Sequence, residues 1–278
     1  MGTFRHNNRN LILIPLVVFL LISSSRLLFA QEEMDTSYTM IAPQNIVNML
    51  IPGKAPVATI QLSFNYNTGL LDLAADDNTS FRKQDFIDGR NFGTRYGYGF
   101  ALTGKFALHQ EGNIRLNITA AYNKFQSNFI VSSSPEGYVS YNVISGALGI
   151  EDCFTADRKF KPYAGLDIIT SFISGNAVLK SDSSDFNLSI KSSMRIGLGI
   201  NMGFEYAFSN NVGMNLGMKL THANLINRES KSSSNANETT LNDAKVTGTP
   251  IPYAGWKQFV YTTFYTGINF YFGMKAKK

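Results

Sequence analysis

The feature that most constrains the fold is a strict alternation of side chains over residues 194–208. Every even position in this segment is large and apolar, and every odd position is small, polar or charged. Because a period of two places these sets on opposite faces of a β-strand, one face meets an apolar medium and the other a crowded polar one. The alternation ends in aromatic residues and recurs along the chain. This pattern predicts a transmembrane β-barrel.

The only long apolar run of the chain lies at its N-terminus. Basic residues precede the apolar segment 11–22, and Ala30 follows it. A basic head, a short apolar core and a small residue at its end predict a secretory signal peptide over residues 1–30. The alternative, a membrane-anchoring helix, is disfavoured because the core is short and is interrupted by Pro15 and Arg26. Without a later apolar stretch, an exported chain is either soluble or a closed barrel.

Composition limits the partners and the chemistry. Residues 1–30 hold three arginines and no acidic residue, so the 25 basic and 20 acidic residues of the whole chain become 22 and 20 after cleavage. The basic character therefore owes much to the signal peptide, and we expect no nucleic-acid partner. Cys153 is the only cysteine, which excludes an internal disulfide and a thiolate metal cage.

Alternating segments recur often enough to predict eight strands. They lie near 58–66, 96–109, 114–122, 138–154, 162–173, 186–208, 212–225 and 259–272. The segment 138–154 is the least regular, because apolar residues occupy both of its faces. We expect a bulge or a register change there.

The connections between these strands alternate between short and long. Short turns are expected near 110–112, 156–159 and 209–211, and long loops near 67–92, 126–137, 175–185 and 226–257. Outer-membrane barrels have tight periplasmic turns and long extracellular loops. The expected fold is therefore all-β, an eight-stranded antiparallel up-and-down transmembrane β-barrel over residues 56–273. A periplasmic N-terminal arm over 31–55 precedes it, and a basic tail over 274–278 follows.

Aromatic residues gather near the strand ends, where amphipathic rings favour the headgroup level of a membrane. The expected outer band contains Phe64, Tyr66, Tyr96, Tyr98 and Tyr122. The expected inner band contains Phe204, Tyr206, Phe208, Phe270, Tyr271 and Phe272. Two bands at opposite ends are difficult to explain by ring pairing within a soluble sheet.

The inward face predicted by parity carries charges of both signs. It contains Lys105, His109, Arg115, Asp167, Arg195, Glu205 and Lys219. Side chains just fill an eight-stranded barrel, so these charges must pair or hold water. We expect Glu205 to pair with Lys105 or Arg115, and Asp167 with Lys219 or Arg195.

Three short motifs add a family resemblance over about residues 56–272. The last strand carries Gly267, Phe270 and Phe272 at the spacing of the assembly signal that the outer-membrane insertion machinery recognises, although six residues follow it. The Pro-Tyr-x-Gly opening at 162–165 and the glycine–aromatic hairpin at 203–206 are also similar to those of small outer-membrane β-barrel proteins. The resemblance implies the outer membrane of a two-membrane bacterium. That family holds passive barrels, adhesins, small channels and a few lipid-modifying enzymes.

Few residues suit catalysis. Some small barrels that deacylate lipopolysaccharide carry a histidine followed two positions later by serine, but His222 is followed by Asn224. His109 beside the first turn is expected to be a satisfied lumen or turn residue. The acidic loop tips at 76–78 and 182–185 lack a full calcium-ligand loop. We expect no catalytic residue, metal or cofactor.

The leading hypothesis is a barrel with a structural role or with a binding role for its extracellular loops, and without catalysis. Its expected partners are outer-membrane lipid, the insertion machinery through Gly267, Phe270 and Phe272, and an extracellular ligand of the loops. A narrow channel for small solutes is the first alternative. A lipid hydrolase and a secreted soluble barrel with an internal ligand are the others.

Overall fold

The computed structural model describes residues 55–74, 83, 85–109, 111–131, 134–180, 185–230, 237–246 and 253–273. All of them belong to one compact unit, Met49–Lys278. The expected signal peptide, nearly all of the expected N-terminal arm and the basic tail lie outside the described residues. Within the described part of the chain, no helix has the length and apolar character needed to span a membrane.

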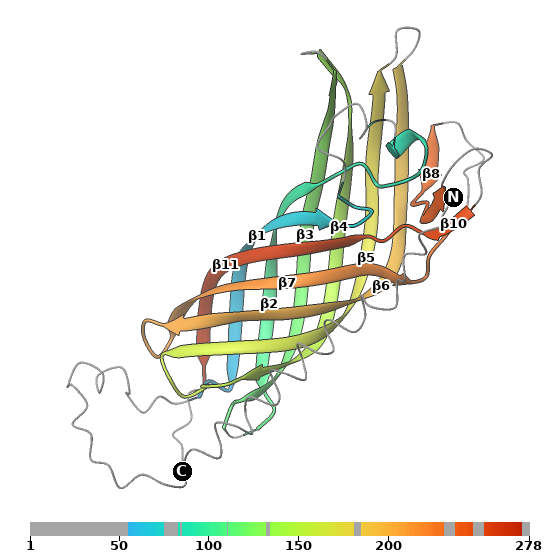
Figure 1. Cartoon of the computed structure of the whole chain (residues 1–278). Coiled ribbons are helices and arrows are strands. Elements are labelled where there is room, and N and C mark those ends of the chain that lie inside the picture. The colour runs from blue at the N-terminus through green and yellow to red at the C-terminus, as the bar shows by residue number, and fades with distance from the viewer. Residues whose placement is uncertain are drawn as a thin grey trace, which may run out of the picture. The chain divides into compact units, whose positions relative to one another are not determined.

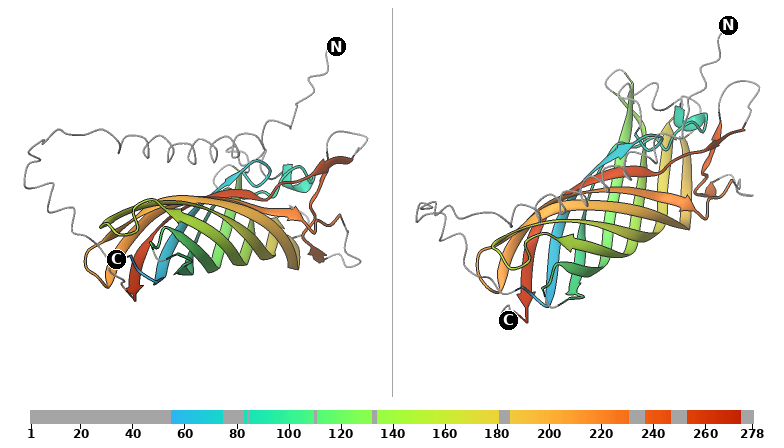
Figure 2. Two further views of the ribbon diagram at one scale, coloured as in Figure 1. Left: turned by 90° about the horizontal axis from the view of Figure 1, so that it is seen from below. Right: turned by 60° about the horizontal axis from the view of Figure 1, so that its bottom comes forward.

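Long strands form a closed antiparallel sheet, which confirms the predicted fold class (Figures 1 and 2). Among the described residues, the eight barrel strands are β1 (Ala58–Leu70), β2 (Tyr96–Ala107), β3 (Ile114–Val131), β4 (Ser134–Cys153), β5 (Phe160–Lys180), β6 (Asp185–Ala207), β7 (Val212–Ile226) and β11 (Val260–Phe272). Each pairs with its neighbour, and the β1–β11 and β5–β6 pairings complete the circle. No barrel edge therefore remains open at the middle of the sheet.

The barrel has two unlike ends. At the turn end, Ala58 lies opposite Phe272, and short connections join β2 to β3, β4 to β5 and β6 to β7. At the loop end lie the other four connections. This arrangement places the start and the finish of the barrel at the turn end.

Two hairpins extend beyond the other strands at the loop end (Figure 1). The expected loops 126–137 and 175–185 are wrong, because β3–β4 pairing continues to Val131 opposite Ser134 and β5–β6 pairing to Lys180 opposite Asp185. The transmembrane alternation stops in these segments since polar residues replace apolar ones on the outer face. The backbone pairing does not stop with it.

The expected long loop 226–257 also contains strands. β8 (Glu238–Thr240) pairs in parallel with β6, where Glu238 lies opposite Ser189. β9 (Ala244–Val246) and β10 (Tyr253–Trp256) form a separate antiparallel pair. This segment therefore adds to the extension at the loop end.

The alternation separates a polar interior from an apolar exterior. In β1, buried and exposed residues alternate almost without exception. Thr59 on the inner face is 1% exposed, whereas Phe100 on the outer face of β2 is 63% exposed. A large apolar side chain with that exposure is favourable in hydrocarbon and unfavourable in water.

The expected irregularity within 138–154 is wrong. From Gly137 to Cys153 the register with β5 is continuous, and the shift in the β3–β4 pair falls between Phe129 and Ile130. Apolar residues occur on both faces of β4 because Ile144 faces outward while Tyr141 packs inside the barrel.

A bulge lies in β7. Leu198 of β6 is opposite His222, but Ile196 is opposite Ile226, so β7 has extra residues at this point. A bulge of this kind turns a side chain to the other face. It brings Asn224, at an even and nominally outward position, into the barrel, where the residue is fully buried. Gly197 permits the close approach of β6 and β7 at this bulge, since a Cβ there would lie 1.9 Å from the carbonyl oxygen of His222.

Candidate functional site

A cluster of four charged residues fills the barrel near the turn end. Lys105 Nζ lies 2.8 Å from Glu205 Oε1 and 3.2 Å from Glu151 Oε2. Arg115 Nη2 lies 3.0 Å from Glu205 Oε1 and also contacts Glu151. All four side chains are at least 98% buried. Two cations and two carboxylates balance in charge, which makes their burial tolerable.

Neutral groups support this cluster. Asn117 Nδ2 donates a hydrogen bond to Glu151 Oε2 over 3.1 Å. Lys105 Nζ lies 4.0 Å from the centroid of the Tyr163 ring, an arrangement suited to a cation–π contact. The Tyr163 hydroxyl in turn lies 2.8 Å from the Tyr265 hydroxyl. The interior at this level is therefore crossed by interacting side chains.

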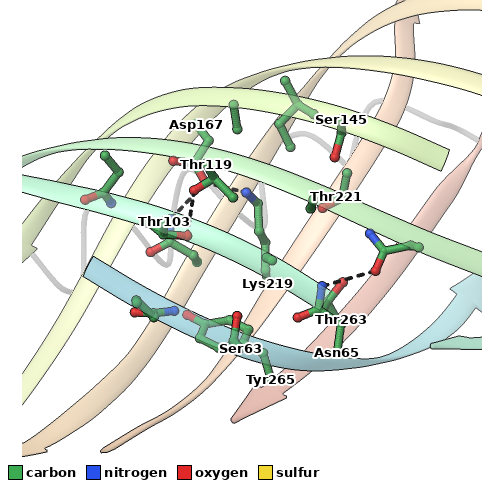
Figure 3. Close-up of a pocket in the computed structure, with 18 of the residues that line it drawn as sticks. Ser63, Asn65, Thr103, Thr119, Ser145, Asp167, Lys219, Thr221, Thr263 and Tyr265 are labelled. Atoms are coloured by element: carbon green, nitrogen blue, oxygen red, sulfur yellow. Dashed lines mark hydrogen bonds and ion pairs between the residues drawn. The ribbon is translucent and has the colours of Figure 1, made fainter. Parts of the chain in front are cut away.

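Above the charge cluster is a polar cavity of about 70 Å³ (Figure 3). Lys219 Nζ lies 2.7 Å from Asp167 Oδ2, and Asn201 Nδ2 donates to the same oxygen over 3.0 Å. The hydroxyls of Thr103 and Thr119 lie 2.9 Å apart on the opposite wall. A volume of this size has room for a few water molecules but not for a drug-sized solute.

Aromatic residues close the barrel on the loop side of that cavity. Phe259 is fully buried, and its ring centroid lies 5.2 Å from that of Phe92 and 5.7 Å from that of Tyr141. The Phe125 ring lies 5.1 Å from that of Tyr261. Aliphatic side chains complete this aromatic layer, namely Leu73, Val139, Val143, Ile173, Ile190 and Leu241. No sequence expectation placed an apolar layer inside the barrel.

Asp243 connects the long loop to the barrel wall. Its Oδ2 accepts hydrogen bonds from Arg195 Nε at 2.9 Å and from the Glu229 backbone N–H at 3.1 Å. Its Oδ1 accepts one from Asn224 Nδ2 at 2.6 Å. Arg195 and Asp243 are both fully buried. Arg195 thus pairs with a loop residue, whereas the sequence had offered it Asp167.

Lys257 lies beside this connection, outside the strands. Its Nζ is 4.7 Å from the centroid of the Phe92 ring, and the residue is 6% exposed. Burial lowers the pKa of Lys257 to about 8, although the neighbouring carboxylates of Asp243 and Asp72 favour its charged form. The charged form of Lys257 is therefore buried on the loop side of the barrel at a cost in desolvation free energy.

Outward-facing aromatic residues lie near both ends of the barrel. On the loop side, Tyr66, Tyr96 and Tyr98 are 48%, 48% and 57% exposed, and Tyr122 is partly exposed. On the turn side, the exposed or partly exposed members are Phe204, Tyr206, Phe208, Phe270 and Phe272. Tyr271 does not belong to this band, because it is only 3% exposed and faces the interior.

An apolar exterior between two aromatic bands, closed backbone pairing and a charge-balanced interior are the requirements of a barrel in lipid. A sequence model described as "Opacity family porin protein" matches residues 109–241. The chain has the fold of a small outer-membrane β-barrel. A search of curated protein sequences gave no match.

Solved structures of similar fold have low sequence identity to this chain. Neisserial surface protein A is 14% identical, with 78% of this chain and 99% of that chain covered and a TM-score of 0.41. OprG from Pseudomonas aeruginosa is 14% identical, with 79% and 97% covered and a TM-score of 0.43. Ail of Yersinia pestis, solved with the heparin analogue sucrose octasulfate, is 11% identical, with 77% and 96% covered and a TM-score of 0.37.

The residues considered for catalysis do not assemble in this barrel. His222 Nε2 lies 3.3 Å from Arg228 Nη2, while Asn224 lies inside the barrel through the β7 bulge. The Asn224 side chain therefore holds the long loop through its hydrogen bond to Asp243. Within the described residues, no group of three or more His, Cys, Asp or Glu side chains is placed to hold a metal ion.

Sequence reasoning missed two interior acids. Glu151 has the same odd parity as Tyr141 and Val143 on its strand, so a consistent parity count would have placed it inside. Asp243 had no such signal, since it lies in a segment without alternation. Only the fold brings it to Arg195.

Proposed function

We propose that this outer-membrane barrel is a closed scaffold that holds an extracellular binding surface and has no catalytic role. The proposal rests chiefly on the interior, which is blocked at two levels by the charge cluster around Glu205 and by the aromatic layer around Phe259. Between them lies only the cavity of about 70 Å³. A solute would have to displace both layers to cross.

Paired strands beyond the outer aromatic band support a binding role. The β3–β4 and β5–β6 hairpins continue past the outer aromatic band as paired strands. The segment 237–246 is fixed to the barrel by Asp243, and β8 pairs with β6. Ordered hairpins lose less conformational entropy on binding than disordered loops do.

Export and assembly are part of the same proposal. Residues 1–30 would direct export and be removed, and Gly267, Phe270 and Phe272 would be recognised by the insertion machinery. Phe270 and Phe272 are 37% and 49% exposed on the lipid-facing side of the last strand, which makes them available to a partner protein before insertion.

Ion currents in planar bilayers test the closed interior. We expect no steady single-channel current from the wild-type barrel. The single-channel current of the wild type is compared with that of the double variant Tyr141→Ala, Phe259→Ala, which lacks two rings of the aromatic layer. A steady wild-type conductance that responds to substitution at Lys219 or Asp167 would contradict the proposal and favour a narrow channel through the polar cavity.

A second assay tests the absence of catalysis. Lipopolysaccharide is incubated with the purified barrel and with its His222→Ala variant, and released fatty acid is measured. We expect no release above the background without protein. Release by the wild type that the variant lacks would establish a lipid hydrolase instead.

A further inference from the structure

A groove of about 620 Å³ lies on the lipid-facing side of the barrel. It crosses β11, β1, β2, β3 and β4, which are neighbours in the sheet (Figure 1). Exposed apolar side chains stand around it, among them Phe64, Phe100, Leu102 and Ile144. Most of the lipid-facing side carries side chains of this size, so the groove is a local break in a bulky surface.

Small residues explain where the groove lies. Ala120 lines it and is opposite Leu102 on one side and Gly146 on the other. A Cβ at Gly146 would meet no heavy atom within 4 Å, so the surface stays low beyond Ala120. The depression is lined mostly by apolar side chains, which suits an acyl chain.

A cation lies above the groove on the same face. Lys124 is two residues beyond Tyr122 on β3, toward the loop end, and is opposite Tyr98 and Asn142. Within the described part of the chain, its ammonium group forms neither an ion pair nor a hydrogen bond. A lysine on a lipid-facing strand is tolerated near the headgroup level and costs about 2–4 kcal/mol at mid-membrane.

A second cation, Arg95, lies further toward the loop end, where its backbone N–H donates to Ser127 Oγ, three residues beyond Lys124 on β3. Arg95 Cζ is 5.6 Å from the centroid of the Tyr96 ring, and the Tyr96 and Tyr66 rings stack at 6.3 Å. These tyrosines belong to the outer aromatic band, which marks the headgroup level. Positive charge and stacked rings therefore border the groove on its outer side.

We infer that this groove and its cationic border bind a phosphorylated, acylated lipid of the outer leaflet. The phosphate contacts Lys124, and an acyl chain lies over Ala120. An anionic phosphate supplies the charge that Lys124 otherwise lacks. The site is independent of the closed interior and of the extracellular surface, so it extends the proposed function.

Native mass spectrometry of the full barrel in neutral detergent tests this inference, with bisphosphorylated lipid A as the probe. Wild-type protein is expected to carry one lipid A. Lys124→Gln is expected to weaken binding by about tenfold, the usual size of one charge-assisted hydrogen bond. Ala120→Phe fills the groove and is expected to weaken it similarly. Both positions face lipid, and circular dichroism establishes that each variant is folded.

Three comparisons distinguish the lipid from other occupants. Lys180→Gln, which removes a cation at the tip of the β5–β6 hairpin, should bind lipid A as the wild type does. Dephosphorylated lipid A and inorganic phosphate should each bind more weakly than lipid A. Equal binding of either compound, or unchanged binding by Lys124→Gln, would overturn the inference. A dimer that Ala120→Phe abolishes and that forms without lipid would identify a second copy of the chain as the occupant, and would also overturn it.

Discussion

At the scale of single residues, the buried charges near the turn end are stable only as a complete set. Lys105 and Arg115 each contact both Glu151 and Glu205, so no carboxylate belongs to one cation. Neutralising either acid leaves two cations to share a single negative charge without access to water. Removing one partner of a buried ion pair is far more destabilising than replacing the whole pair by apolar residues, because it leaves an uncompensated buried charge.

We therefore predict that Glu205→Gln lowers the free energy of unfolding by about 3–5 kcal/mol. Urea-induced unfolding of the barrel in lipid vesicles measures the change. Glu111→Gln removes an exposed acid in the nearby β2–β3 turn and should change stability by less than about 0.5 kcal/mol. A Glu205→Gln variant as stable as Glu111→Gln would show that the cluster does not carry the stability assigned to it.

Lys257 gives a pH dependence whose direction follows from its pKa. Burial holds that pKa at about 8 in the folded protein, below the usual lysine value of 10.5. Between these values the unfolded chain binds a proton that the folded chain has released, so stability rises with pH across that window. Below about pH 8 both states are protonated and this contribution to the pH dependence vanishes.

Trp256, the only tryptophan and the neighbour of Lys257, reports the effect. We predict that the thermal transition seen in its fluorescence lies higher at pH 9.5 than at pH 7. In Lys257→Met the difference between the two pH values should shrink. A variant with the same pH dependence as the wild type would assign the effect to other groups.

At the scale of elements, the faces of the strands could be predicted and their ends could not. The inward position of Thr59 and the outward position of Phe100 follow from hydrocarbon on one side, which imposes a period of two. That constraint ends at the membrane surface, so nothing in the alternation indicated that β3 continues to Val131. The expected loop 126–137 was drawn where the apolar pattern stopped.

In the candidate site, too, some contacts could be predicted from the sequence and others could not. Parity placed Glu205 and Lys105 in one small space, and their contact at 2.8 Å requires only the barrel geometry. The partner of Arg195 could not be found, because Asp243 reaches it through a loop whose path depends on tertiary contacts. The inward position of Asn224 could not be predicted, because the β7 bulge turns its side chain to the other face of the sheet without a signal in the sequence.

The attachment of the long loop to the barrel leads to a prediction about that element. Asp243→Asn keeps the shape of the side chain but leaves Arg195 buried without its counter-charge. We predict that the loop detaches while the barrel persists. Trypsin should then cleave after Lys245 at least about tenfold faster, since about 1.4 kcal/mol of lost attachment is a tenfold change in the detached fraction. Trp256 fluorescence should shift to the red.

Asp85→Asn is the matched control for that experiment. It removes a partly exposed carboxylate that lies 3.2 Å from Arg90, in another loop. Its cleavage rate should equal that of the wild type. Loss of strand content in Asp243→Asn by circular dichroism would mean that the ion pair supports the barrel itself and not the loop alone.

At the scale of the whole molecule, the closure of the barrel by the last strand has to be separated from the proposed role of that strand in assembly. β11 closes the barrel against β1, and it also carries the residues expected to guide assembly. Gly267 serves the closure, because a Cβ there would lie 1.9 Å from the Leu62 carbonyl oxygen. Substitution at Gly267 would disturb both roles, so Phe270 and Phe272 are the informative positions.

We predict that Phe270→Ala, Phe272→Ala reduces the amount of folded barrel in the outer membrane several-fold in cells. The purified variant should still refold in detergent, because both rings face lipid and their removal leaves no cavity in the interior. Phe64→Ala and Phe100→Ala, two lipid-facing rings on β1 and β2, provide the control for lost contact with the membrane. If the control pair lowers assembly as much, or if the test pair fails to refold after purification, the rings stabilise the barrel and are not a signal. A defect confined to cells and to β11 would instead show that a partner recognises this strand before the barrel closes.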